Sequence, residues 1–131
     1  MTTSEKPAFD LSGTYVDLKD GGVTTPIELT ADFWAELESG ALRVGGRLMG
    51  AFPLTGDMTH WEMHPAGDEL LYLLSGAADI LLEEMGGERR IALRAKEACI
   101  VPKGVWHRII VRTPGELMFV TAGEGTQHRP L

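Results

Sequence analysis

Histidine and glutamate residues gather in the middle of the chain at spacings that suit metal coordination. His60, Glu62 and His64 alternate along one segment, and alternate residues of a β-strand point to the same face of a sheet. If that face lies inside the protein, two imidazoles and a carboxylate enter an apolar interior, where unpartnered polar groups are costly. A divalent cation removes this cost, because both groups are normal ligands of first-row metals. The segment therefore predicts a metal site.

The elements that must position these side chains are short strands. The chain has 131 residues, about one domain, and its 16 glycines fall mostly between short apolar runs. Such runs, broken by Gly, Pro or charged turns, indicate an all-β sandwich or barrel. The predicted strands are 42–44, 47–52, 57–64, 70–74, 78–83, 89–93, 99–101, 107–111 and 117–121, with a hairpin turn at 85–88.

The first third of the chain has a different pattern. Residues 1–30 are expected to form an N-terminal arm, with short extended stretches at 15–18 and 27–29, and residues 31–131 the single barrel domain. One short helix is predicted over residues 30–37, with a capping residue, a helically spaced apolar face and a terminating glycine. These features are Thr30 as the cap, Phe33, Trp34 and Leu37 on the face, and Gly40 at the end.

Two segments resemble the sequence motifs of the cupin superfamily. The first cupin motif reads Gly, five residues, His-x-His, three or four residues, Glu, six residues, Gly; the residues in register are Gly56, His64, Glu69 and Gly76. The second motif corresponds to the segment Pro102-Lys103-Gly104-Val105-Trp106-His107. Over residues 42–121 the chain is thus similar to small single-domain cupins. The resemblance implies an all-β jelly-roll barrel, here with one short N-terminal helix.

The resemblance also implies a set of metal ligands: Glu62, His64, Glu69 and His107. Glu62 stands where the family usually has histidine, while Lys96 replaces the first glycine of the second motif and Val111 its final asparagine. Two carboxylates and two neutral imidazoles would balance one divalent ion of Fe, Mn, Ni, Co or Zn. His60 is expected beside the site, hydrogen-bonded to Glu62 rather than bound to the ion.

Two other roles for Glu62 remain open. It could act as a general base above the metal, or it could pair with an interior arginine, Arg43 or Arg47, in a barrel without metal. His128, in the polar tail, is expected to be solvated. Trp61 and Trp106 lie one residue off the ligand faces and are expected to pack or to line a subunit interface.

The walls of the site are expected to be apolar. Ile109 and Val111 share the face of His107, and Leu71 and Leu73 share that of Glu69, while Tyr72 should point away. This favours a small, weakly charged organic molecule as the ligand. We expect a metal-dependent enzyme of the dioxygenase or the isomerase/lyase type. A non-catalytic module that binds or senses a small ligand and a metal-free structural barrel are the alternatives, because this fold hosts many functions.

Charge and composition narrow the class further. A net charge of −7 and a pI of about 5.0 argue against nucleic acid or an anionic membrane as partner. The one cysteine, Cys99, excludes an internal disulfide framework and lies in an apolar run that predicts burial. No signal-peptide pattern opens the chain, and the longest apolar run, 70–74, is too short to span a bilayer. We expect a cytoplasmic homodimer whose N-terminal arms cover a sheet edge.

Overall fold

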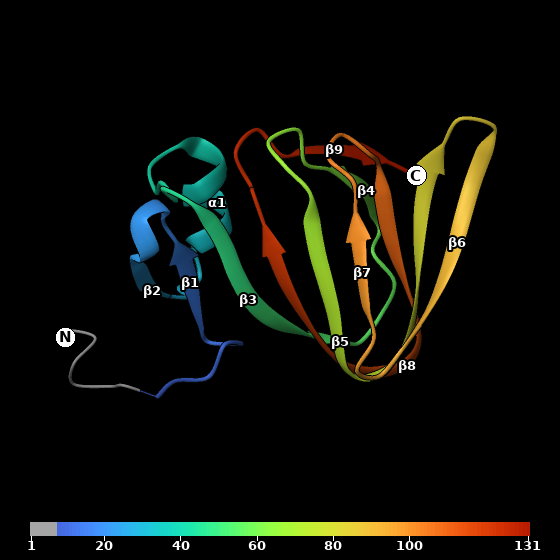
Figure 1. Ribbon diagram of the computed structural model, residues 1–131, viewed down its shortest axis with the longest axis horizontal. Coiled ribbons are helices and arrows are strands. Elements are labelled where there is room, and N and C mark those ends of the chain that lie inside the picture. Colours follow the sequence, from blue (N-terminus) through green and yellow to red (C-terminus); the bar gives the residue numbers. More distant parts are fainter. Residues whose placement is uncertain (1–7) are drawn as a thin grey trace.

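The protein is predominantly β, and its strands curve around an interior (Figure 1) that is filled by a cluster of buried apolar side chains. The computed structural model describes residues 8–131. Within them lie nine strands, one α-helix and one 3-10 turn. In chain order these are β1 (Thr14–Leu18), η2 (Asp20–Gly22), β2 (Thr24–Glu28), α1 (Phe33–Ser39), β3 (Arg47–Leu54), β4 (His60–Met63), β5 (Glu69–Glu84), β6 (Gly87–Arg94), β7 (Ala98–Val101), β8 (His107–Thr121) and β9 (Gln127–Pro130).

All of these strands belong to one antiparallel sheet, which is not closed. A path of hydrogen-bonded neighbours runs β2-β1-β3-β8-β4-β9, and β5 joins it through β8 while also pairing with β6 and β7. Within the described residues, β2, β6, β7 and β9 each pair with a single strand. The prediction of a closed barrel is therefore wrong. The predominantly β architecture itself is as the sequence predicts.

The two longest strands replace four shorter predicted ones. Predicted strands 70–74 and 78–83 form the single strand β5, and 107–111 and 117–121 form β8. The pairing between β5 and β8 shifts register between Leu73 and Ala78, so the chain bends without leaving the sheet. Gly76 lies in this bend with φ of 85°, and a Cβ atom there would meet the Thr113 carbonyl oxygen at 2.5 Å. The motif glycine thus marks a bulge rather than a turn.

The N-terminal region forms an extension of the sheet. β1 pairs with β2 in a hairpin and with β3 on its other side. Helix α1 begins at Phe33, and its N-cap residue Asp32 makes no side-chain capping bond, so the expected cap by Thr30 is wrong. Gly40 takes the left-handed conformation at the C-terminal end. Residues 42–44 form no strand, and β9 was not predicted because its sequence is polar.

The interior is filled by alternate residues of the central strands. Leu71 and Leu73 of β5 are almost fully buried, as are Leu117 and Phe119 of β8. Tyr72, between the two leucines, is only half-buried, as strand alternation requires. Cys99 is buried as predicted, and this burial raises the pKa of its thiol. None of the helices in residues 8–131 is long and apolar enough to cross a membrane.

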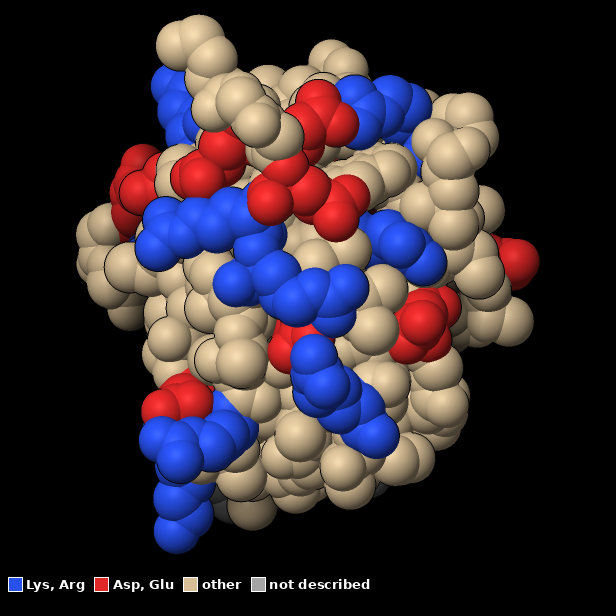
Figure 2. Space-filling model, turned by 90° about the vertical axis from the view of Figure 1, so that its right-hand side faces the viewer, with Lys and Arg blue, Asp and Glu red and all other residues tan. Residues whose placement is uncertain are grey.

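Cationic side chains cross the face of the protein that carries β6 (Figure 2). Beneath them Asp79 of β5 is completely buried. One of its carboxylate oxygens accepts hydrogen bonds from Arg112 of β8 and Arg90 of β6. These hydrogen bonds, from Arg112 first, hold the pKa of Asp79 below its usual value despite the opposing effect of burial. The two arginines thus compensate a buried charge and tie β5, β6 and β8 together.

The turn before β7 contains a strained residue. Lys96 has φ of 72°, and it stands where the second cupin motif has glycine. The left-handed region costs a non-glycine residue roughly 1–2 kcal/mol, and the backbone N–H of Lys96 donates to the Leu73 carbonyl, which fixes the turn. The positive φ at this position therefore explains why the family has glycine there.

Replacing Lys96 by glycine is expected to stabilise the protein by about 1 kcal/mol, after allowing for the greater freedom of glycine in the unfolded chain. The measurement is the free energy of unfolding in urea. The matched control is Lys103→Gly, because Lys103 is also an exposed turn lysine but does not have positive φ. The control should be neutral or destabilising. A loss of stability in Lys96→Gly would contradict the strain argument.

Candidate metal centre

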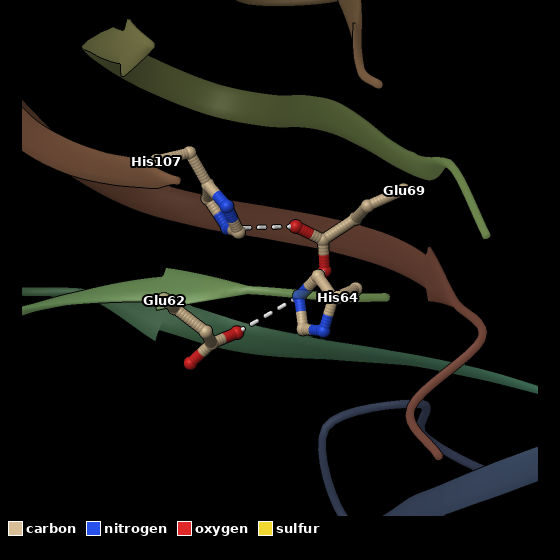
Figure 3. Close-up of side chains that lie close together, drawn as sticks. All are labelled: Glu62, His64, Glu69 and His107. Atoms are coloured by element: carbon tan, nitrogen blue, oxygen red, sulfur yellow. Dashed lines mark ion pairs between the residues drawn. The ribbon is translucent and has the colours of Figure 1, made fainter. Parts of the chain in front are cut away.

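Four side chains from three strands point toward one another inside the sheet (Figure 3). Glu62 lies on β4, His64 directly follows β4, Glu69 opens β5 and His107 opens β8. Glu62 pairs with His107 across the β4–β8 ladder. Glu69 is placed opposite both Val101 and Thr121. The four residues that the family resemblance implies as ligands are thus brought together by strand pairing.

The ligand atoms of these residues form a tight cluster. His64 Nε2 lies 3.0 Å from Glu62 Oε1 and 3.3 Å from Glu69 Oε2, and His107 Nε2 lies 3.0 Å from Glu69 Oε1. One ligand atom from each of the four residues lies within 4.8 Å of all the others. His64, Glu69 and His107 are buried, whereas about a quarter of the Glu62 side chain is exposed.

Several of these atoms have no hydrogen-bond partner. Four buried side-chain polar atoms in residues 8–131 lack one, and three belong to the cluster: His64 Nε2, Glu69 Oε1 and His107 Nδ1. The short contacts across the cluster therefore lack hydrogen-bond geometry. Buried polar atoms without a partner each cost about 1–3 kcal/mol. Two of the three, His64 Nε2 and Glu69 Oε1, are on the sides that face the cluster, and this indicates a missing partner there.

The electrostatics of the cluster favour positive charge. Burial alone lowers the pKa of His64, but the Glu62 and Glu69 carboxylates outweigh it and raise this pKa to about 9. Burial raises the pKa of Glu69, but His107 and His64 outweigh it and lower this pKa to about 2. The pKa of Glu62 is lowered in the same way by His64, against the effect of its burial. The two carboxylates thus stay ionised and attract a cation.

The donor set fits a divalent transition metal. Two imidazole nitrogens and two carboxylates provide mixed nitrogen and oxygen coordination, and their charges sum to −2 when the imidazoles are neutral. The partnerless Nε2 of His64 and Oε1 of Glu69 are atoms that such an ion would engage.

Two threonines that sequence reasoning missed support the cluster. The hydroxyl of Thr121 on β8 donates to Glu69 Oε2. Thr126 Oγ1 lies 2.8 Å from His64 Nδ1 and donates its own hydrogen to the Gly123 carbonyl, 2.7 Å away. Because that hydroxyl has one hydrogen, it accepts from His64 Nδ1, which leaves the lone pair of a neutral His64 on Nε2, toward the cluster. Threonine is too common in strands and turns for its sequence to signal this role.

Replacing Thr126 by valine is expected to lower metal affinity about ten-fold, because the orientation and tautomer of His64 are no longer fixed. The measurement is competition for the metal against a chelator of known affinity. The control is Thr126→Ser, which keeps the hydroxyl and should keep the affinity. Equal loss in both variants would show that the methyl group, not the hydrogen bond, matters.

The remaining polar candidates lie at the outer side of Glu62. His60 Nε2 is 3.8 Å from Glu62 Oε2, beyond hydrogen-bond distance, so the expected hydrogen bond is absent. His128, expected to be solvated, is 3.3 Å from the same oxygen and about 41% exposed. Within the described chain, neither Arg43 nor Arg47 forms an ion pair with Glu62, and this weakens the metal-free alternative.

The two tryptophans beside the ligand strands pack against one arginine. The guanidinium of Arg129 lies 4.6 Å from the ring centre of Trp106 and 5.6 Å from that of Trp61. It also pairs with Glu83. These contacts agree with the packing role expected for Trp61 and Trp106, and they attach β9 to the rest of the sheet.

A cavity of about 1110 Å³ adjoins the cluster and includes all four of its residues in its lining. Most of its walls are apolar, and Leu71 and Ile109 line it as predicted, whereas Leu73 and Val111 do not. Arg43 is the one Lys or Arg side chain that lines it within residues 8–131. The apolar lining consists of Tyr15, Trp34, Leu37, Leu42, Val44, Leu48, Phe52, Met58, Leu71, Ile109 and Phe119.

Solved structures with this fold are similar in shape but distant in sequence. A cupin-2 domain containing protein from Shewanella frigidimarina superposes with a TM-score of 0.50 and 22% identity, over 60% of this chain and 72% of that one. Hydroquinone 1,2-dioxygenase from Sphingomonas, bound to 4-hydroxybenzoate, has a TM-score of 0.50 and 17% identity over 57% of this chain and 58% of its own. A mutant of Bacillus subtilis oxalate decarboxylase has a TM-score of 0.54 and 19% identity over 65% and 24%. The chain thus spans less than two thirds of either enzyme.

The family assignment comes from the sequence comparison. No curated protein matches the chain in sequence. The model of the family described as "Cupin domain" matches residues 53–127, which include both predicted motifs and the four clustered residues. This match covers more than half of the 131 residues, and it confirms the resemblance that the motifs indicated: the chain belongs to the cupin domain family.

Proposed function

We propose that the protein binds one divalent transition-metal ion through Glu62, His64, Glu69 and His107 and is a metal-dependent enzyme. The observation that carries this proposal is the pair of buried atoms without hydrogen-bond partners, His64 Nε2 and Glu69 Oε1, that face the interior of this group of four side chains. Fe, Mn, Ni, Co and Zn all suit the mixed donor set. The two histidines with one glutamate resemble the ligand sets that leave positions open for a substrate.

The substrate is proposed to be a small, weakly charged organic molecule. The apolar walls of the cavity would exclude water from such a molecule and hold it next to the cluster. Arg43 alone provides a fixed positive charge in the described lining, so a strongly anionic substrate would find few partners. The similar dioxygenase and decarboxylase structures support chemistry on small organic molecules.

The reaction is proposed to be of the dioxygenase or the isomerase/lyase type. A bound metal ion would supply either activation of O₂ or polarisation of a carbonyl group. The protein's own contributions are the position of the substrate against the cluster and the fixed orientation of His64 by Thr126. Glu62, the most exposed of the four, lines the cavity and is proposed to accept a proton if it does not bind the ion.

The test is the metal content of protein purified without a histidine tag or chelator. Elemental analysis and an X-ray absorption edge scan should show one tightly bound equivalent of a transition metal. Protein that contains none and takes up none on incubation would contradict the proposal. Metal without turnover of any small organic molecule would favour the non-catalytic binding or sensing module instead.

We also propose that the protein is a homodimer, formed through an exposed apolar face rather than through the expected N-terminal arms, because β1 pairs with β2 and β3 of its own chain. Ile100 of β7 lies opposite Leu70 of β5, and these outward apolar side chains are 61% and 36% exposed, with Leu74 nearby at 39%. Light scattering should give twice the chain mass of 14.3 kDa. The variant Ile100→Lys should shift the protein to the monomer, because it places a charge in this apolar face. A parent that is monomeric at every accessible concentration would reject the dimer.

A further inference from the structure

A second group of metal-ligand side chains lies at the mouth of the cavity. His60 and Glu62 stand two residues apart on β4, and His128 of β9 is the direct cross-strand partner of Glu62. All three side chains line the cavity. The ligand atoms of this group also lie within 4.8 Å of one another, and the rings of His60 and His128 meet edge to face at 4.8 Å.

Glu62 presents its two oxygens to two different groups. Its Oε1 lies 3.0 Å from His64 Nε2 in the inner cluster. Its Oε2 lies 3.3 Å from His128 Nε2 and 3.8 Å from His60 Nε2. The imidazoles of His60 and His128 thus face Oε2, whereas Oε1 is the Glu62 oxygen that faces the inner cluster. A carboxylate with one oxygen on each side is the geometry of a ligand that bridges two cations.

Helix α1 adds a carboxylate behind one of these histidines. Glu38 Oε1 lies 3.8 Å from His128 Nδ1, on the opposite side of the ring from Glu62. At this distance the two groups are not hydrogen-bonded, and the Glu38 carboxylate acts through its negative charge, which attracts a cation held by His128.

We propose that His60, Glu62 and His128 bind a second divalent transition-metal ion at the cavity mouth, with Glu62 bridging it to the inner ion. The bridging role rests on the proposed function, whereas the outer ligand set stands by itself. His60 and His128 are each about 41% exposed, so the outer ion binds more weakly than the buried inner one and exchanges with solution. As a consequence, the outer metal ion occupies the cavity entrance and adds its positive charge there only when the metal concentration is high.

The test is the number of Zn²⁺ ions bound by metal-stripped protein in equilibrium dialysis. The parent is expected to bind two, the outer one at least ten-fold more weakly. The double variant His60→Ala/His128→Ala should bind only the tight ion, and His64→Ala/His107→Ala only the weak one. An unchanged number of ions in His60→Ala/His128→Ala would overturn the outer site. One ion in the parent that is lost in this variant and kept in His64→Ala/His107→Ala would refute the inner site while supporting the outer one.

Two further measurements isolate the roles of the Glu38 charge and of the Glu62 bridge. Glu38→Gln should weaken the outer Zn²⁺ about three-fold, because it removes an exposed negative charge near the ion, and leave the inner one unchanged; Glu36→Gln on the same helix, which does not line the cavity, is the matched control. With Mn²⁺ in both sites, the electron paramagnetic resonance spectrum should show a spin-coupled pair. Two bound Mn²⁺ ions without coupling would overturn the bridge.

Discussion

Replacing His107 by alanine is expected to lower the affinity for the inner metal ion at least ten-fold while the sheet stays folded. The variant removes one coordinate bond, and metal-binding free energy depends directly on the number and geometry of ligands. His107 is only about 1% exposed and lies 3.0 Å from Glu69. The vacated space should therefore also cost roughly 2–4 kcal/mol of stability, less than the whole stability of an ordinary domain.

The matched control for this variant is Ile109→Ala. Ile109 lies two residues further along β8, points into the same cavity and is 3% exposed. Its truncation should lower stability by a similar amount and leave the metal content unchanged. Circular dichroism and elemental analysis of both variants separate the loss of a ligand from the loss of packing. Unchanged metal content in a folded His107→Ala protein would count against the assignment.

Replacing Glu62 by histidine is expected to keep the metal bound and to change which metal is preferred. The variant would restore the three-histidine, one-glutamate set typical of the family, with one negative charge fewer. Preference should shift toward metals that favour imidazole over carboxylate. Competition between Mn²⁺ and Ni²⁺ or Zn²⁺ for parent and variant measures this shift. Equal preferences in both proteins would indicate that residue 62 does not bind the ion.

Replacing Glu62 by glutamine distinguishes a ligand from a base. If Glu62 binds the ion, Glu62→Gln should lose metal affinity at least ten-fold, because a neutral amide is a poorer ligand. If Glu62 is a general base, the variant should keep its full metal content and lose turnover. We expect the first result. A metal-loaded crystal structure with Glu62 turned away from His64, Glu69 and His107 would contradict it.

The site residues that lie on strands could be predicted from the sequence. The alternation of His60, Glu62 and His64 predicts that these side chains share a face, whereas Glu69 and His107 enter the predicted site through the resemblance to the cupin motifs. Strand periodicity is a local pattern, so it can be recognised directly in the sequence. The same holds for the buried leucines of β5, which alternate as the pattern predicts.

Other features depend on contacts that no local pattern encodes. The sequence predicts a break between two strands at Gly76, because a glycine in a strand resembles a turn, whereas the structure has a bulge there. His128 is exposed as its polar surroundings in the sequence predict, but its place beside Glu62 follows only from the pairing of β9 with β4. Thr126 reaches His64 from 62 residues away. Whether the sheet closes depends on which distant strands pair with one another, and a local sequence pattern does not predict those pairs.

The arrangement of β5 and β8 has a consequence for the order of events in folding. Glu69 at the start of β5 meets Thr121 at the end of β8, 52 residues later, and His64 needs Thr126, later still. The loops that these contacts close are long, so the contacts form only after much of the sheet has assembled. A metal ion held by residues at such positions stabilises the native state more than the folding transition state. Its binding free energy should therefore slow the rate of unfolding and leave the rate of folding nearly unchanged.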